Sequence, residues 1–147
     1  MICLFSIQAW AQSGKLFNTD NQLSSNLATQ VFQDKSGFIW IATRNGLNNY
    51  DGYHINVIKK DMSNFLGLNS NYIISLAQDE KEHILLGTNN SLLEFTGSEF
   101  LKIPMLDSKG EELATYVKQV YPLKNKDVAV ATSGYGIMIK KKDAQEC

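Results

Sequence analysis

The side chains of this chain that could take part in chemistry lie mostly in or beside expected turns. Acid–base catalysis needs paired carboxylates, and the obvious candidates are Asp34 and Asp79. A metal site needs clustered ligands, but His54 and His83 are the only histidines, and the two cysteines form no CxxC pair. No GxSxG, HExxH, P-loop or GxGxxG motif occurs in the 147 residues. We therefore expect no enzymatic activity, no metal site and no cofactor, and we expect both histidines to be structural.

A second group of side chains suits the recognition of a sugar. Aromatic faces stack on sugar C–H groups, and planar amide or guanidinium groups pair with hydroxyls. Arg44 and Tyr135 each follow the second expected strand of their segment, so they should share one end of the fold. The candidate ligand-binding residues are Arg44, Asn48, Tyr72 and Tyr135. The competing interpretation of each is an ordinary surface residue in a turn.

An internal repeat sets the elements that position these residues. Residues 25–52 align without a gap with residues 70–97 at an offset of 45. A fainter third copy follows, at an offset of 89 over Val128–Thr132 and of 90 over Gly136–Ile139. The pairs that keep their identity between the first two copies are Ser25/Ser70, Asn26/Asn71, Gln33/Gln78, Asp34/Asp79, Ile39/Ile84, Thr43/Thr88, Asn45/Asn90, Leu47/Leu92 and Gly52/Gly97.

The repeat separates structural residues from functional ones, because a residue that recurs at one position in each copy is expected to stabilise the fold. An aspartate that recurs before a turn is expected to accept backbone N–H bonds. Recurring glycines are expected to supply a positive φ in hairpins. The residues we assign to structure are Asp34, Asp79, Trp40, Thr43, Thr88, Thr132, Gly46, Gly52 and Gly97. The sugar-binding candidates are non-recurring residues.

Each copy divides into four short strands separated by turns, which predicts an all-β fold. In the first copy these are 28–33, 38–43, 46–50 and 54–58, rich in β-branched and aromatic residues. Four strands in about 45 residues are typical of a β-propeller blade. The predicted division is an outer strand of the closing blade at 15–23, blade 1 at 24–68, blade 2 at 69–113 and a partial blade 3 at 114–147. About three blades fall short of the usual four to eight, so we expect a fragment of a larger, truncated propeller.

The composition is that of a globular protein, and the N-terminal residues indicate that the protein is exported. A net charge of −1 shows no basic face for nucleic acid, and 44% hydrophobic residues are typical of a globular chain. Residues 1–11 have an apolar run and a small-x-small cleavage pattern, as in the second half of a secretory signal peptide. A first buried strand is the alternative. We expect an exported, periplasmic protein, and no run approaches the roughly 20 apolar residues of a membrane span.

The first copy resembles the two-component-regulator propeller repeat. That repeat has a strand ending in Gln-Asp, a Gly, an Ile-Trp-Ile-Gly-Thr strand, a Gly-Leu and a Tyr-Asp-Gly. The matching residues are Gln33-Asp34, Gly37, Ile39 to Thr43, Gly46-Leu47 and Tyr50 to Gly52, with Ala42 where Gly is usual. The second copy is more degenerate, and the third keeps little beyond Ala131-Thr132 and Gly136-Ile137.

This resemblance implies the sensor region of a Bacteroidetes hybrid two-component system, with paired seven-bladed propellers, an inner-membrane anchor, a histidine kinase and a DNA-binding domain in the full-length protein. It implies an oligosaccharide ligand and control of polysaccharide utilisation. The implied partners are the remaining blades of the propeller and a second copy of the full-length protein in a homodimer. The resemblance implies no direct contact of this chain with nucleic acid, and contact with the membrane only through other segments of the full-length protein. None of the kinase motifs lies in this chain. The alternative is an exported propeller enzyme, lyase-like, or an interaction scaffold.

Overall fold

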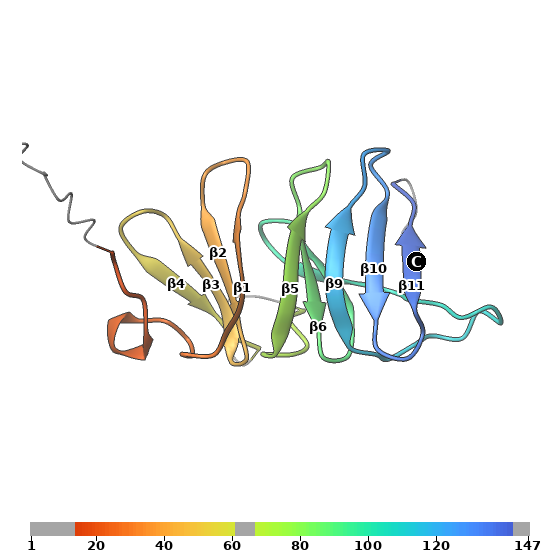
Figure 1. Cartoon of the computed structure of the whole chain (residues 1–147), viewed down its shortest axis with the longest axis horizontal. Helices are drawn as coiled ribbons and strands as arrows, with labels where there is room; N and C mark the ends of the chain where they lie inside the picture. The colour runs from red at the N-terminus through yellow and green to blue at the C-terminus, as the bar shows by residue number, and fades with distance from the viewer. Residues whose placement is uncertain (1–13, 61–66, 143–147) are drawn as a thin grey trace, which may run out of the picture.

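The computed structural model describes residues 14–60 and 67–142, which form three antiparallel sheets standing side by side (Figure 1). The signal peptide predicted at 1–11 lies outside the described residues. Sheet 1 has the order β1-β2-β3-β4, with β1 (Ala28–Gln33), β2 (Ile39–Thr43), β3 (Gly46–Tyr50) and β4 (Ile55–Ile58). Sheet 2 has the order β5-β6-β7-β8, with β5 (Ile73–Gln78), β6 (Ile84–Thr88), β7 (Leu92–Phe95) and β8 (Phe100–Ile103). Sheet 3 has the order β9-β10-β11, with β9 (Val117–Pro122), β10 (Val128–Thr132) and β11 (Ile137–Lys140).

The sheets confirm the predicted all-β architecture of about three blades, the third with three strands among the described residues. Within each sheet, every strand pairs with the next one along the chain, as in a meander. The register of β1 on β2 shifts between Ala28 and Gln30, and that of β5 on β6 shifts at the equivalent place, between Ile73 and Ser75. The repeat in the sequence is therefore also a repeat of strand pairing and of its irregularities.

The second strand of sheet 2 is buried on both faces because sheet 1 covers one face and sheet 3 covers the other. All five residues of β6 are buried. Ile84 and Leu86 point into the core between sheets 1 and 2, while Leu85 points into the core between sheets 2 and 3. Side chains alternate across a strand, so a strand between two layers is apolar at every position. This is the physical reason why Ile84, Leu85 and Leu86 are all apolar.

The recurring residues close the turns. Asp34 Oδ1 accepts the N–H of Phe38 at 3.0 Å, and Asp79 Oδ1 accepts the N–H of His83 at 2.9 Å. Trp40 is buried in the core, packs edge-to-face on Phe95, and donates its Nε1–H to Asp34 Oδ2 at 2.8 Å. The hydroxyls of the recurring threonines donate to the carbonyl across the next turn, Thr43 to Gly46, Thr88 to Ser91 and Thr132 to Gly136.

Two kinds of glycine occupy the hairpins. Gly52 and Gly97 have φ of +102° and +99°, and a side chain at either would meet open space. They are glycines because of the backbone conformation, which other residues adopt at a cost. Gly46 has φ of +134°, and in addition a Cβ there would lie 3.0 Å from the carbonyl oxygen of Ile58. Space and conformation together require a glycine at the start of β3.

Side chains of β1, the first strand of sheet 1, donate and accept hydrogen bonds with the backbone of β5 in sheet 2. Gln30 Nε2 donates to Leu76 O at 3.0 Å, and Leu76 N–H donates to Gln30 Oε1 at 2.7 Å. Thr29 Oγ1 donates to Ile73 O at 2.7 Å. Ser75 occupies the position of Gln30 in the second copy, 45 residues later, and is buried between sheets 2 and 3. Within the described residues its hydroxyl has no hydrogen-bond partner.

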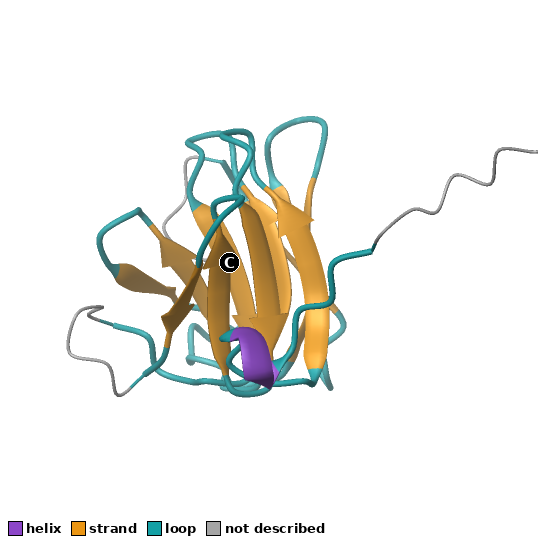
Figure 2. Ribbon diagram, turned by 90° about the vertical axis from the view of Figure 1, so that its left-hand side faces the viewer, coloured by secondary structure: helices purple, strands orange, loops and turns teal. Residues whose placement is uncertain are grey.

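The segment 15–23 differs from the prediction of an outer strand. It holds a short 3-10 helix, η1 (Thr19–Asn21), capped by the Asn18 side chain and visible at the lower edge in Figure 2. The N–H groups of Asn21 and Leu23 both donate to Asn18 O. A strand needs the hydrogen bonds of a neighbouring strand, and these backbone groups are instead satisfied within the segment. Over residues 14–60 and 67–142, no helix has the length and apolar character needed to span a membrane.

Candidate ligand-binding edge

Arg44 and Tyr72 are brought together at the edge of the sheets where β2 turns into β3 and where β5 begins, the lower edge in Figure 1. Arg44 lies in the two-residue turn between β2 and β3, and its N–H donates to Leu27 O at 3.1 Å. The guanidinium carbon lies 5.3 Å from the ring centroid of Tyr72. This distance is within the range of a cation–π contact, which orients the planar guanidinium group at the surface.

The contact continues into the third sheet. The rings of Tyr72 and Tyr116 meet edge-to-face, with centroids 6.1 Å apart and an interplanar angle of 86°. Tyr116 directly precedes β9 and is 45% exposed. Arg44, Tyr72 and Tyr116 therefore form a row with one member from each of three consecutive repeats, which we call the Arg44 row. Its two aromatic rings and its guanidinium group are the residue types that sugar recognition uses.

Sequence reasoning missed Tyr116, although the repeat contains the signal. Leu27, Tyr72 and Tyr116 stand at equivalent positions, offset by 45 and 89 residues from the first. Each lies at the start of an innermost strand, where the chain enters a new sheet. Tyr135 is at the same edge, in the turn between β10 and β11, and is 54% exposed. That turn is the counterpart of the Arg44 turn, because Ser133 N–H donates to Tyr116 O as Arg44 N–H donates to Leu27 O.

Asn48 corrects the prediction of a ligand-binding amide. Its side chain is fully buried, and Nδ2 donates to Ile41 O and to Ser24 Oγ, each at 2.9 Å. Its Oδ1 accepts the N–H of Ser24 at 2.8 Å. The amide is thus engaged on both sides in holding the connection before β1 against β3. In sheet 2 Leu93 takes the place of Asn48, and the connection before β5 is held instead by Asn69, whose side chain bonds to Ser91 Oγ in the turn before β7.

His54 and Asp51 form a turn at the opposite end of β3. Asp51 Oδ1 accepts the N–H groups of His54 and Tyr53, at 2.6 and 2.8 Å. These backbone bonds, that of His54 first, hold the pKa of the Asp51 carboxyl below its usual value. The His54 ring is exposed, with Nδ1 3.6 Å from Asp51 Oδ2. This geometry stabilises the charged form of the Asp51 carboxylate in the turn between β3 and β4.

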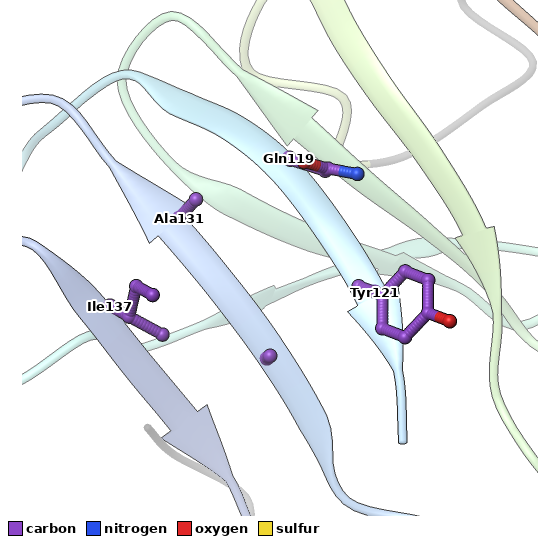
Figure 3. Close-up of a pocket in the computed structure, with 5 residues that line it drawn as sticks. Gln119, Tyr121, Ala131 and Ile137 are labelled. Carbon is purple, nitrogen blue, oxygen red and sulfur yellow. The ribbon is translucent and has the colours of Figure 1, made fainter. Parts of the chain in front are cut away.

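A hollow of about 200 Å³ lies on the outward face of sheet 3, between Gln119, Tyr121 and Ile137 (Figure 3). Two alanines of β10, Ala129 and Ala131, form its floor. Sheet 1 has an equivalent of every one of these residues on the face that sheet 2 covers: Gln30, Phe32, Trp40, Ala42 and Leu47. The hollow is therefore the counterpart of a packing surface between sheets, and we do not assign a ligand to it.

Comparison with known proteins bears on the family of the repeat. Residues 22–45 match the two component regulator propeller family. The match covers the β1–β2 hairpin of sheet 1 and the turn that holds Arg44. No curated protein matches the chain.

Solved structures share the fold at low sequence identity. The extracellular domain of the hybrid two component system BT3049 of B. thetaiotaomicron matches with a TM-score of 0.68 and 19% identity, over 86% of this chain and 17% of that chain. The corresponding domain of BT4673 from the same organism gives 0.67 and 18%, over 82% and 17%. A streptogramin B lyase gives 0.52 and 11%, over 80% and 41%. The chain spans about a sixth of the length of the two sensor domains, and these likenesses establish the fold of propeller blades.

Proposed function

We propose that this chain is part of a ligand-sensing propeller in an exported, periplasmic sensor of the hybrid two-component type, and that it binds oligosaccharide at the Arg44 row. The match of residues 22–45 to the two component regulator propeller family supports the sensor role. The likeness of the fold to extracellular domains of two hybrid two component systems supports an exported location. Kinase and DNA-binding functions would reside in other parts of such a sensor.

The observation that carries the ligand class is the Arg44 row. Tyr116 presents nearly half of its surface to solvent, and the edge-to-face contact with Tyr72 fixes the angle between the two rings. Rings that are fixed before binding lose little side-chain entropy when a sugar stacks on them. The Arg44 guanidinium carbon lies over the Tyr72 ring, 5.3 Å from its centroid, and a guanidinium group carries five N–H donors that can pair with sugar hydroxyls.

A binding role agrees better with this edge than a catalytic one. The row contains one cation and two phenols, and it has no carboxylate beside an imidazole that could transfer a proton. The likeness to a streptogramin B lyase concerns the fold at 11% identity and transfers no active-site residue. The outward face of sheet 3 provides a place for the other partner we propose, a further blade packed as sheet 2 packs on sheet 1.

The test is calorimetric titration of the full chain with a panel of neutral and acidic oligosaccharides from plant and host glycans. We expect at least one oligosaccharide to bind and the variants Arg44→Ala and Tyr72→Ala each to weaken binding about tenfold, which corresponds to about 1.4 kcal/mol. The matched control is Tyr53→Ala, which removes a tyrosine that is 85% exposed in the turn between β3 and β4 and should leave binding unchanged. Binding that is equal in all three variants, or no binding across the panel, would overturn the proposal.

A further inference from the structure

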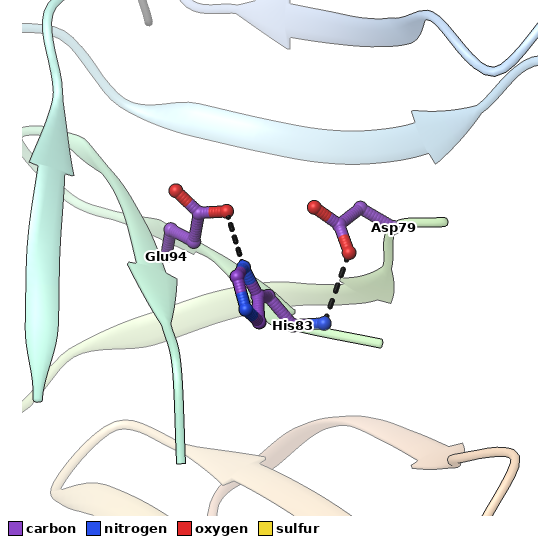
Figure 4. Close-up of side chains that lie close together, drawn as sticks. All are labelled: Asp79, His83 and Glu94. Atoms are coloured by element: carbon purple, nitrogen blue, oxygen red, sulfur yellow. Dashed lines mark hydrogen bonds and ion pairs between the residues drawn. The ribbon is translucent and has the colours of Figure 1, made fainter. Parts of the chain in front are cut away.

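Three potential metal ligands converge at the end of sheet 2 opposite the Arg44 row (Figure 4). Asp79 follows β5, His83 precedes β6, and Glu94 lies on β7. One ligand atom of each lies within 4.8 Å of the others, and all three residues are half-buried. His83 Nδ1 and Glu94 Oε1 are 2.7 Å apart.

Comparison with sheet 1 isolates what is new in this cluster. The equivalents of Asp79, His83 and Glu94 in the first copy are Asp34, Phe38 and Asn49. The aspartate is therefore common to both copies, whereas the imidazole and the second carboxylate occur in the second copy. Two differences between the copies, one in the β5–β6 turn and one on β7, place an imidazole and a second carboxylate beside a carboxylate that both copies share.

A third difference between the copies concerns the hydrogen bonds that the shared aspartate accepts. In sheet 1 both carboxylate oxygens of Asp34 have donors, the N–H of Phe38 on Oδ1 and the indole N–H of Trp40 on Oδ2. In sheet 2 Leu85 stands where Trp40 stands in sheet 1, so the indole donor to Oδ2 is lost. Asp79 Oδ1 keeps its turn bond to the His83 N–H. The second oxygen of Asp79 is thus available on the side where His83 and Glu94 approach, as Figure 4 shows.

We propose that Asp79, His83 and Glu94 form a Zn²⁺ site. One imidazole nitrogen and two carboxylate oxygens are a donor set that suits zinc, and the two negative charges complement a dication. An imidazole ligand disfavours Ca²⁺ and Mg²⁺, which select oxygen ligands. Three protein ligands leave a fourth position for water, as in an open zinc site.

The ligand distances are compatible with this ion after small side-chain rotations. Zinc bonds of about 2.0–2.2 Å in a tetrahedron place ligand atoms about 3.5 Å apart. The 2.7 Å contact between His83 and Glu94 must therefore open by about 1 Å, and the widest separation of 4.8 Å must close by about as much. Asp79 and Glu94 are half-buried and belong to neither hydrophobic core, so their side chains can rotate without disturbing the core packing. The bound ion would join the β5–β6 turn to β7.

The experiment uses the full chain with Cys3→Ser and Cys147→Ser, so that thiols do not contribute to metal binding. After treatment with a chelator, Zn²⁺ is titrated in competition with a chromophoric chelator. We expect one ion to bind per chain, and Co²⁺ in its place to give the visible absorption of a tetrahedral site. His83→Phe and Glu94→Asn, which install the residues of the first copy, should each weaken Zn²⁺ binding at least tenfold while the far-UV circular dichroism is kept.

The matched control is His54→Phe, because His54 also lies beside an aspartate but is exposed and belongs to no cluster of three ligands among the described residues. It should leave the Zn²⁺ affinity and stoichiometry unchanged. Absence of Zn²⁺ binding, unaltered affinity in both His83→Phe and Glu94→Asn, or loss of binding in His54→Phe would overturn the proposal. These outcomes do not depend on whether the Arg44 row binds a sugar.

Discussion

Gln30 of the first repeat and Ser75 of the second stand at equivalent positions. Gln30 bonds to the backbone of Leu76 whereas the Ser75 hydroxyl has no such bonds among the described residues, so we expect their substitution to change stability in opposite directions. Gln30→Leu removes two bonds, of 3.0 and 2.7 Å, and leaves the N–H and C=O of Leu76 without these partners between the sheets. A neutral hydrogen bond contributes about 0.5–1.5 kcal/mol, and an unpaired buried group costs about 1–3 kcal/mol. We expect the free energy of unfolding to fall by about 2–4 kcal/mol.

Ser75→Ala is expected to act in the opposite direction. Ser75 is 2% exposed, and its hydroxyl has no partner within the described residues, so its removal relieves a desolvation cost. We expect a gain of up to about 1 kcal/mol. The control is Gln33→Leu, the same substitution three residues along β1, where the side chain is exposed and bonds only to its own hairpin at Gly37. It should change stability by about 0.5 kcal/mol or less.

The assay is urea unfolding at one protein concentration, followed by tryptophan fluorescence and far-UV circular dichroism. With a slope of about 2 kcal/mol/M, Gln30→Leu should lower the midpoint by about 1–2 M. Ser75→Ala should leave the midpoint unchanged or raise it. A Gln30→Leu chain that unfolds at the wild-type midpoint, or a Ser75→Ala chain that loses as much as Gln30→Leu, would refute the view that Gln30 fastens sheet 1 to sheet 2.

Two further predictions follow from the C-terminal sheet. Hydrogen bonds from the Lys141 ammonium and then from the Lys142 N–H lower the pKa of the Asp127 carboxyl below its ordinary value of 3.8. The ionised carboxylate therefore stabilises the fold above pH 3.8, and this stabilisation is lost as the pH falls through the folded-state pKa. In Asp127→Asn the loss of stability between pH 5 and pH 3, measured by urea midpoints, should be smaller, and equal acid sensitivity would contradict this. We also expect the full chain to self-associate through the outward face of sheet 3, where Ile137 is 71% exposed. Ile137→Lys should shift sedimentation toward the monomer, whereas Leu101→Lys on β8 should not, and a wild-type chain that sediments as a monomer would exclude this interface.

The strands and turns were predictable because short-range chemistry sets them. The ranges 28–33 and 46–50 agree with β1 and β3 to the residue, and the ranges 38–43 and 54–58 each exceed their strand by one residue. Alternation of side chains, a positive φ at glycine and an aspartate that accepts nearby N–H groups all act within a few residues. The segment 15–23, predicted as an outer strand of the closing blade, holds the 3-10 helix η1 in this chain, and a strand there depends on neighbouring strands that its own residues do not specify.

The candidate site was predictable only in part. Arg44 and Tyr72 were selected as non-recurring residues, and the structure places them in contact. The same criterion selected Asn48, which differs from its equivalent Leu93 because it holds the connection before β1 against β3. Tyr116 was not predicted, although in the third copy it stands where Tyr72 stands in the second. A residue repeated around an array of blades can also build a repeated surface.

The sequence by itself determined the repeat and the strand order within each copy, because these depend on residue type and on local spacing. Only the tertiary structure decided which side chains meet across sheets. The Arg44 row joins residues 28 and 44 positions apart, and the Asp79 cluster joins two residues of the β5–β6 turn to Glu94 on β7. Such contacts depend on strand register and on the packing of one sheet against the next. These two features arise from many weak interactions summed over the whole core, and no single spacing in the sequence encodes them.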